Sequence, residues 1–281
     1  MTVALHAFPK SQQFTHVSAD DEVLLRDFRE SISLKTIWWN LALNDLRSRY
    51  RRTRLGPWWI VIGLGITLSS MSLLWATIFN LPWREFVPYM LVSLVTWNWI
   101  AGSITGACNI YVGEYSGLLR TTPLPPMVHA MRFVVLNFLT HLHNMTIPIG
   151  ALIICGTIPS LSLVYWLPIS TALVMINAFC FAIYLGFVGA RLRDFSNLVG
   201  AVMAPMMLLT PVMWKVNMLG EHSSIISLNP FYHFITVVRA PFLGEPVPTV
   251  SWIAVLIMTM INIGLASFCY RRYRKMLVFW L

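Results

Sequence analysis

The chain has 281 residues, of which 57% are hydrophobic and 11% are charged, and its formal net charge is +9. Soluble domains carry about 25% charged residues, so this composition excludes the two soluble domains that the length alone would allow. The basic residues lie beside apolar segments, which indicates anionic lipid headgroups as their partner and argues against nucleic acid.

The first thirty residues are polar and include the acidic run Asp20-Asp21-Glu22. No apolar core follows a basic start there, so we expect no cleaved signal peptide, and the first span serves as its own insertion signal. The predicted organisation is a flexible N-terminal segment over residues 1–30 and one membrane domain over residues 31–281.

Residues 33–50 alternate apolar and charged side chains at near-helical spacing. Ser33 is a suitable N-cap, and Trp38 and Trp39 are typical anchors at a membrane surface. This pattern predicts an amphipathic helix in the inner headgroup layer. The alternative is a soluble helix packed on a partner.

Five segments contain no Asp, Glu, Lys or Arg: 55–83, 86–113, 133–190, 195–214 and 246–270. A membrane span needs about 20 apolar residues, and a charge in hydrocarbon is costly. The third segment is too long for one helix and breaks at the turn-forming residues 156–160. We therefore predict an all-α integral membrane protein with six spans, at about 57–79, 86–110, 130–155, 161–189, 196–214 and 250–269.

The basic residues are distributed unequally between the two sides of these six spans. One side holds 17 of the 20 Lys and Arg residues, and the other holds only Arg84, Lys215 and Arg239. The positive-inside rule then places both termini in the cytoplasm. An odd number of spans would separate the two basic termini.

The segment between the fifth and sixth spans, residues 215–249, is mostly apolar and aromatic, and Asn229-Pro230 divides it. Each half is too short to span a bilayer. We predict two short re-entrant helices that enter from the outer face. The alternative is an ordinary extracellular loop.

Residues suited to catalysis or metal binding are scarce. His141 and His143 lie two positions apart and so face different sides of a helix, which favours packing or pore lining over metal binding. The four cysteines lie in apolar segments and are expected to behave as small buried hydrophobes. No Asp, Glu or Lys lies within the spans to couple transport to ions, and no nucleotide-binding motif is present. We expect no catalytic residue, metal or cofactor in this chain, so another polypeptide must supply the energy.

Aromatic residues are abundant and offer faces on which sugar rings could slide. Trp75, Tyr89 and Trp97 are the candidates for a channel wall. The aromatic belt found at the ends of membrane spans accounts for such residues equally well.

Five segments of the sequence stand out together by their order and spacing. They are Asp45-Leu-Arg-Ser-Arg-Tyr-Arg-Arg-Thr-Arg-Leu-Gly-Pro-Trp-Trp, Ala190-Arg-Leu-Arg-Asp-Phe, Thr210-Pro-Val-Met-Trp, Leu228-Asn-Pro-Phe-Tyr and Arg239-Ala-Pro-Phe-Leu-Gly. Together they resemble the permease subunit of type-2 ABC exporters of polysaccharides, the family of O-antigen, capsule and teichoic-acid exporters. The resemblance runs from about residue 35 to the C-terminus, and the order and spacing of its segments are more specific than any one of them. Thr210 stands where the family has Ser before Pro-Val.

The resemblance implies a transport subunit of the bacterial inner membrane and not an enzyme. Two copies would form a homodimeric channel, and two separate ABC ATPases would bind ATP and Mg. The loop after the second span would dock on the ATPase, and the outer loop would form the re-entrant helices. The docking residues are Glu114, Tyr115, Leu118, Leu119, Arg120 and Pro123, and the outer-loop residues are Asn229, Pro230 and Arg239.

The implied cargo is a lipid-linked polysaccharide of O-antigen or capsule type, as used in lipopolysaccharide biosynthesis. Arginine binds phosphate through paired hydrogen bonds, so arginines at the inner mouth of the first span are candidates for binding the lipid diphosphate. Positive-inside anchoring accounts for any one of them as well. They are Arg47, Arg49, Arg51, Arg52 and Arg54.

Two other functions remain open. The same architecture could export drugs or small lipids. A membrane-embedded glycosyl- or acyltransferase is the second alternative, for which Glu114, Asp194 and the pair His141 and His143 are the available polar groups, although they form no evident constellation.

Overall fold

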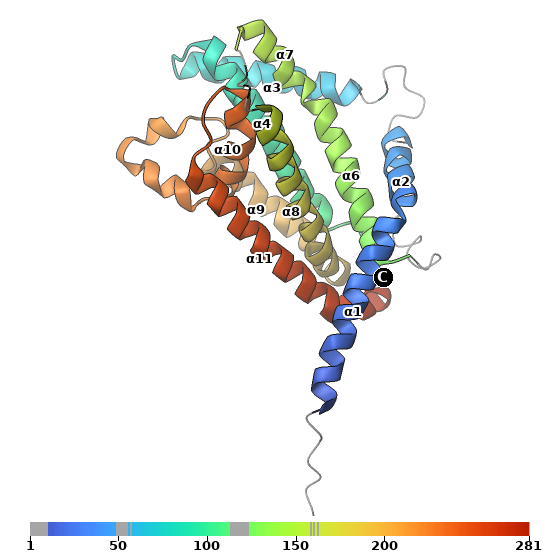
Figure 1. Cartoon of the computed structure of the whole chain (residues 1–281). Coiled ribbons are helices and arrows are strands. Elements are labelled where there is room, and N and C mark those ends of the chain that lie inside the picture. Colours follow the sequence, from blue (N-terminus) through green and yellow to red (C-terminus); the bar gives the residue numbers. More distant parts are fainter. Residues whose placement is uncertain are drawn as a thin grey trace, which may run out of the picture.

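The computed structural model describes residues 11–48, 56, 58–112, 124–157, 159, 161 and 163–280, with the side chains of 11–20 left aside. In this part of the chain all regular elements are helices (Figure 1). The helices are α1 (Ser11–Ser33), α2 (Lys35–Ser48), α3 (Trp58–Ile78), α4 (Trp83–Ala107), α6 (Pro126–Asn144), α7 (Thr146–Cys155), α8 (Leu163–Arg191), α9 (Phe195–Leu209), η1 (Val216–Leu228), α10 (Pro230–Phe242), α11 (Thr249–Tyr273), η2 (Arg274–Met276) and α12 (Leu277–Trp280).

Five helical segments of the described chain are long and apolar enough to cross a membrane: α3, α4, α6 with α7, α8, and α11 with its C-terminal extension. Each lies within a few residues of a predicted span, so the prediction of an all-helical membrane protein is confirmed. The predicted break after residue 155 is also present, because Gly156 closes α7 with a φ of 71°, a conformation that glycine adopts without strain.

The fifth predicted span, 196–214, is only partly helical. Helix α9 has 15 residues, which corresponds to about 22 Å at about 1.5 Å per residue. It ends at Leu209, and Thr210 is extended with a ψ of 137°. Pro211 follows, and a residue that precedes proline is disfavoured in a helix. The chain continues to Trp214 as irregular backbone.

Helix α4 is the central element of the bundle. It packs against α3, α6, α7, α8, α9 and α10, and most of its residues are buried. A helix that is apolar on all sides is expected to be enclosed in this way. Glycines let α8 approach the end of α4 closely, as small residues do in membrane helix pairs. A Cβ atom on Gly189 would lie 1.9 Å from the Cys108 carbonyl oxygen, which is a severe steric overlap.

Helix α3 crosses the upper end of the bundle, transverse to α6 and α8 (Figure 1). Its first residue, Trp58, lies edge-on to His143 with 6.1 Å between ring centroids. Further along, Gly65 faces Ile147 of α7. Helix α3 is therefore held by α4 on one side and by the junction of α6 and α7 on the other.

The N-terminal end differs from the expectation. Residues 11–30, predicted to be a flexible segment, form most of α1, and Asp27 is only 1% exposed. Its partners are Tyr270 and Arg274 at the far end of the chain. The polar composition of this segment predicted exposure to solvent. Local composition could not reveal the burial of Asp27, because its partners lie more than 240 residues away in the sequence.

Helix α2 forms over the predicted amphipathic segment and packs lengthwise against α6. Ala42 and Leu46 cluster with apolar residues of α6. Beside them Arg132 donates from Nε and Nη2 to the two carboxylate oxygens of Asp45, over 2.6 and 2.5 Å. This paired geometry fixes both the position and the rotation of α2 on α6.

Changing Asp45 to Asn should loosen α2 from α6. The neutral amide cannot accept both charged hydrogen bonds, so we expect a loss of about 1–3 kcal/mol, because both side chains are largely buried. Limited proteolysis of the protein in detergent should then cleave α2 faster. The matched control is Lys35→Gln at an exposed position of the same helix. Equal cleavage rates for the two variants would contradict this role of the ion pair.

Candidate functional site

The candidate site is built around the irregular backbone that follows α9. The last carbonyls of a helix lack partners within the helix, and in a bilayer irregular backbone is tolerated only where the protein itself satisfies it. Thr210 and Val212 are fully buried. Three predicted residues from two other elements, Tyr89, Asn229 and Arg239, bind this segment.

Arg239 of α10 is 5% exposed. Its Nη1 donates to the Pro211 carbonyl and to Ser93 Oγ, each over 2.9 Å. Its guanidinium carbon lies 4.1 Å from the centroid of the Tyr89 ring, which is a cation–π contact. A buried charge is costly unless it is paired and hydrogen-bonded, and these three contacts provide that compensation. Arg239 thereby joins α10 to α4 and to the end of α9.

Tyr89 of α4 contacts the same turn through its hydroxyl. Its hydroxyl lies 3.2 Å from the Pro211 carbonyl and 3.0 Å from the Trp214 carbonyl. Lys215 Nζ lies 5.6 Å from the Tyr89 ring centroid. Two cations thus approach the ring at this end of α4.

Asn229 satisfies two helix ends together. Its Oδ1 accepts from the Phe231 N–H over 2.9 Å and so caps α10. Its Nδ2 donates to Thr210 Oγ1 over 3.0 Å and to the Leu209 carbonyl over 3.2 Å. Pro230 occupies the first position of α10, where its missing N–H costs nothing. The end of α9 and the start of α10 therefore share one side chain.

Aromatic rings connect the three predicted channel residues to this site. Trp75 stacks on Phe79 at 5.0 Å, and the series continues through Phe86 to Tyr89 at 6.3 and 6.1 Å. Trp97 lies 5.4 Å from Phe231 of α10. Tyr89 and Trp97 are buried within this single chain, whereas Trp75 is partly exposed. Their role as a channel wall stays a prediction.

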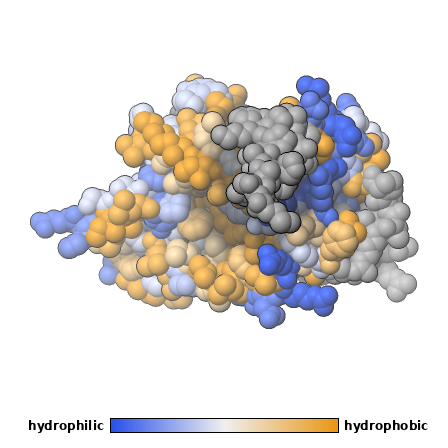
Figure 2. All heavy atoms as spheres, turned by 90° about the horizontal axis from the view of Figure 1, so that it is seen from below, coloured by the Kyte–Doolittle hydropathy of each residue, from blue (hydrophilic) through white to orange (hydrophobic). Residues whose placement is uncertain are grey.

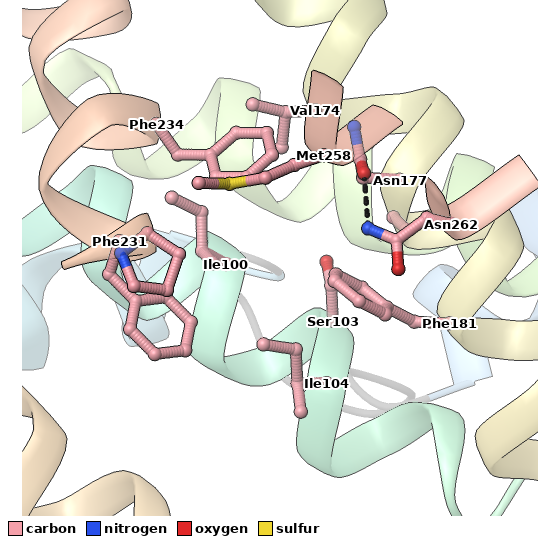
Figure 3. A pocket seen from close by; sticks show the side chains of 12 residues that line it. Ile100, Ser103, Ile104, Val174, Asn177, Phe181, Phe231, Phe234, Met258 and Asn262 are labelled. Atoms are coloured by element: carbon pink, nitrogen blue, oxygen red, sulfur yellow. Dashed lines mark hydrogen bonds between the residues drawn. The ribbon is translucent and has the colours of Figure 1, made fainter. Parts of the chain in front are cut away.

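A cavity of about 240 Å³ lies beneath the start of α10, between α4, α8 and α11 (Figure 3). Asn262 Nδ2 donates to Asn177 Oδ1 over 2.7 Å, and Asn177 Nδ2 donates to Thr259 Oγ1 over 2.8 Å. Ser103 also lines the cavity, and its buried hydroxyl has no hydrogen-bond partner within the described chain. Its lining carries no charged side chain, so the cavity suits neutral groups only.

Several predicted residues are not brought into this site. Arg47 is exposed in the last turn of α2. The other four candidate arginines and all six residues of the predicted docking loop lie outside the described residues. Those residues are Arg49, Arg51, Arg52, Arg54, Glu114, Tyr115, Leu118, Leu119, Arg120 and Pro123.

Sequence reasoning missed the polar side chains inside the spans. Ser93, Asn177 and Asn262 are uncharged, and the search for intramembrane function considered titratable groups only. Polar residues within membrane spans are scarce and usually make contacts between helices. The positions of Asn177 and Asn262 could therefore have predicted a contact between their two helices. Pro211 could likewise have indicated the early end of α9.

Comparison with known proteins gives one family and two relatives. The family described as ABC-2 type transporter matches residues 36–243, from α2 to just beyond α10. The chain is similar to two proteins named "O-antigen export system permease protein RfbA" from Klebsiella pneumoniae. Each is 26% identical over 238 residues, which cover 82% of this chain and 90% of the relative.

Proposed function

Because the chain belongs to the ABC-2 type transporter family, we propose that it is the membrane subunit of an ATP-driven exporter of a lipid-linked polysaccharide. The observation that carries this proposal is the similarity to two O-antigen export permeases over 90% of their length. It agrees with a chain that has membrane-spanning helices and, in its sequence, no nucleotide-binding motif. The cargo is an O-antigen or capsule-type glycan, which moves outward from the cytoplasm.

The proposed membrane topology has six crossings and both termini in the cytoplasm of a bacterial inner membrane. It requires α3, which lies transverse to α6 and α8 in the single chain (Figure 1), to turn and cross the bilayer as the first of the six. Helix α9 with residues 210–214 makes the fifth crossing, in which the outer part is irregular and is stabilised by Tyr89, Asn229 and Arg239. Helix α10 is then a re-entrant helix, and η1 lies at the outer surface. The charge distribution of the sequence supports this orientation.

The proposed assembly contains two copies of this chain and two ABC ATPases. Closure of the ATPases on ATP shifts the membrane helices as rigid bodies, through the docking loop that contains Glu114, Tyr115, Leu118, Leu119, Arg120 and Pro123. In this chain α10 must follow α4 and the end of α9, because Arg239 and Asn229 join α10 to both of them.

The arginines before α3 are proposed to attract the diphosphate of the cargo to the cytoplasmic entrance. We expect substitution by Gln, one at a time at Arg47, Arg49, Arg51, Arg52 and Arg54, to reduce export for at least one position. Surface glycan should be measured in cells that lack the chromosomal copy, after insertion and pairing with the ATPase are verified. Unchanged export for all five variants would contradict the diphosphate role and leave the transporter assignment intact.

Purification of the chain from its own cells tests the proposed function. An ABC ATPase should copurify, and its ATP hydrolysis should rise when lipid-linked glycan is added. A stable complex that responds to drugs or to small lipids, and not to glycan, would support the alternative exporter instead. Glycosyl or acyl transfer by the chain in the absence of nucleotide would contradict a transport subunit.

A further inference from the structure

An apolar groove with a volume of about 520 Å³ lies under helix α1, away from the site described above. α1 forms one side, and α6, α8 and α11 form the others. Its polar lining is restricted to Ser267, the thiol of Cys180 and the hydroxyl end of Tyr270, and the remaining lining is aliphatic, aromatic or methionine. The apolar residues of α1 that line it are Leu24, Leu25 and Phe28.

The groove has the depth of one membrane leaflet. Along α8 its lining extends from Met175 to Ile183, which is about 12 Å at about 1.5 Å per residue. Half of a hydrocarbon core of about 30 Å is about 15 Å. Three of its four walls belong to helices that are long and apolar enough to cross the membrane. A chain of methylene groups from a single leaflet therefore matches both its length and its chemistry.

A polar clasp closes the groove at the end near the C-terminus. Tyr270 donates its hydroxyl to Asp27 Oδ2 over 2.7 Å, and Arg274 Nε lies 2.6 Å from the same oxygen. Outside this buried contact, Arg271 Nη1 lies 2.5 Å from Asp21 Oδ1. These contacts join α1 to α11, and Phe28 contacts Phe179 of α8 with 6.4 Å between ring centroids.

The surface around the clasp carries a net positive charge. Residues 21–30 and 270–275 together contain six basic and four acidic side chains. Arg26 and Arg29 on α1 and Arg271 and Arg272 on α11 are exposed. In the view from below, hydrophilic side chains lie on the right, the side where Figure 1 places α1 and the end of α11, and a second hydrophilic group projects at the far left (Figure 2). An anionic headgroup would be attracted to this end of the groove.

We propose that the groove under α1 binds one acyl chain of an anionic phospholipid of the inner leaflet, with its headgroup beside Arg26 and Arg29. Helix α1 covers the acyl chain, and the contacts of Asp27 with Tyr270 and Arg274 hold α1 in place. This inference requires no glycan cargo, so it is independent of the proposed function.

Native mass spectrometry of the full-length protein from nanodiscs tests the proposal. One set of discs contains phosphatidylglycerol and phosphatidylcholine in equal amounts, and a second set also contains a polyprenyl phosphate. We expect one retained lipid per chain, predominantly phosphatidylglycerol. Equal retention of the two phospholipids, or retention of the polyprenyl phosphate alone, would overturn the proposal.

Two variants with a matched control link the retained lipid to the groove. Ala266→Trp fills the groove from α11, and Leu25→Asp places a charge in it from the exposed side of α1. Each should lower retention at least about ten-fold, the factor that corresponds to two buried methylene groups at about 0.8 kcal/mol each. Ile32→Asp, at an exposed position of α1 that does not line the groove, should retain the lipid. Leu25→Asp tests the site even if Ala266→Trp does not fold. Undiminished retention in Leu25→Asp, or equal loss in Ile32→Asp, would contradict the site.

Discussion

Replacing Arg239 by methionine is expected to lower surface glycan at least about ten-fold, while the chain still reaches the membrane. Methionine has a similar length and adapts to irregular spaces, but it donates no hydrogen bond. The Pro211 carbonyl and the Ser93 hydroxyl would lose their common donor. A hydrogen bond to a charged group contributes about 1.5–3 kcal/mol, and about 1.4 kcal/mol is a factor of ten in an equilibrium. Helix α10 would then lose the side chain that fixes it to α4 and to the end of α9.

Arg84 provides the matched control for this experiment. It is an exposed arginine near the same end of α4, and its guanidinium carbon lies 5.5 Å from the centroid of the neighbouring Trp83 ring. Arg84→Met also removes one positive charge from this end, but among the described residues it breaks no buried hydrogen bond. Export by this variant should equal that of the wild type. Normal export by Arg239→Met, at equal protein levels, would show that the hydrogen bonds of Arg239 are dispensable.

Gly189→Ala is expected to destabilise the bundle more than the same change at any other helical glycine of the described chain, because its added methyl group meets the closest neighbour. The added Cβ would lie 1.9 Å from the Cys108 carbonyl oxygen, and backbone cannot rotate away as a side chain can. Overpacking costs about 1–3 kcal/mol, and we expect the upper end of that range. At about 2–4 °C per kcal/mol for a chain of this size, the melting temperature in detergent should fall by about 6–12 °C.

Gly264→Ala is the control for the glycine prediction. Gly264 lies inside α11, and no atom lies within 4 Å of the position that its Cβ would take. Alanine favours a helix by about 1 kcal/mol over glycine, so this variant should melt at the same temperature or slightly higher. If Gly189→Ala and Gly264→Ala had the same melting temperature, α4 and α8 would not cross as closely as described.

The five long spans could be predicted from the absence of charge, because the cost of a charge in hydrocarbon leaves long uncharged runs. The break at Gly156 followed from turn chemistry. The absence of charge also extended the predicted fifth span to Trp214, whereas helix α9 ends at Leu209. Absence of charge shows that a segment tolerates an apolar environment, and it does not show that the segment is helical. The proline at position 211 carried that information.

The contacts that hold the site and the N-terminal helix could not be predicted from the sequence. Asp27 and Tyr270 are separated by 243 positions, and Ser93 and Arg239 by 146. No periodicity within one segment specifies such a pairing. Asn229 was expected to divide two short helices, and the structure adds that its amide also binds the end of α9. Local turn chemistry indicated the division, and only the packing of α9 against α10 reveals the second role.

The central claim is that this chain provides a path for glycan and has no motor of its own. Proteoliposomes should be prepared with the chain alone and with the ABC ATPase that copurifies with it, each with and without ATP. The measurement is the amount of lipid-linked glycan that reaches the far side of the bilayer. We predict directional transfer only when chain, ATPase and ATP are all present. Directional transfer by the chain alone, without nucleotide, would contradict the account.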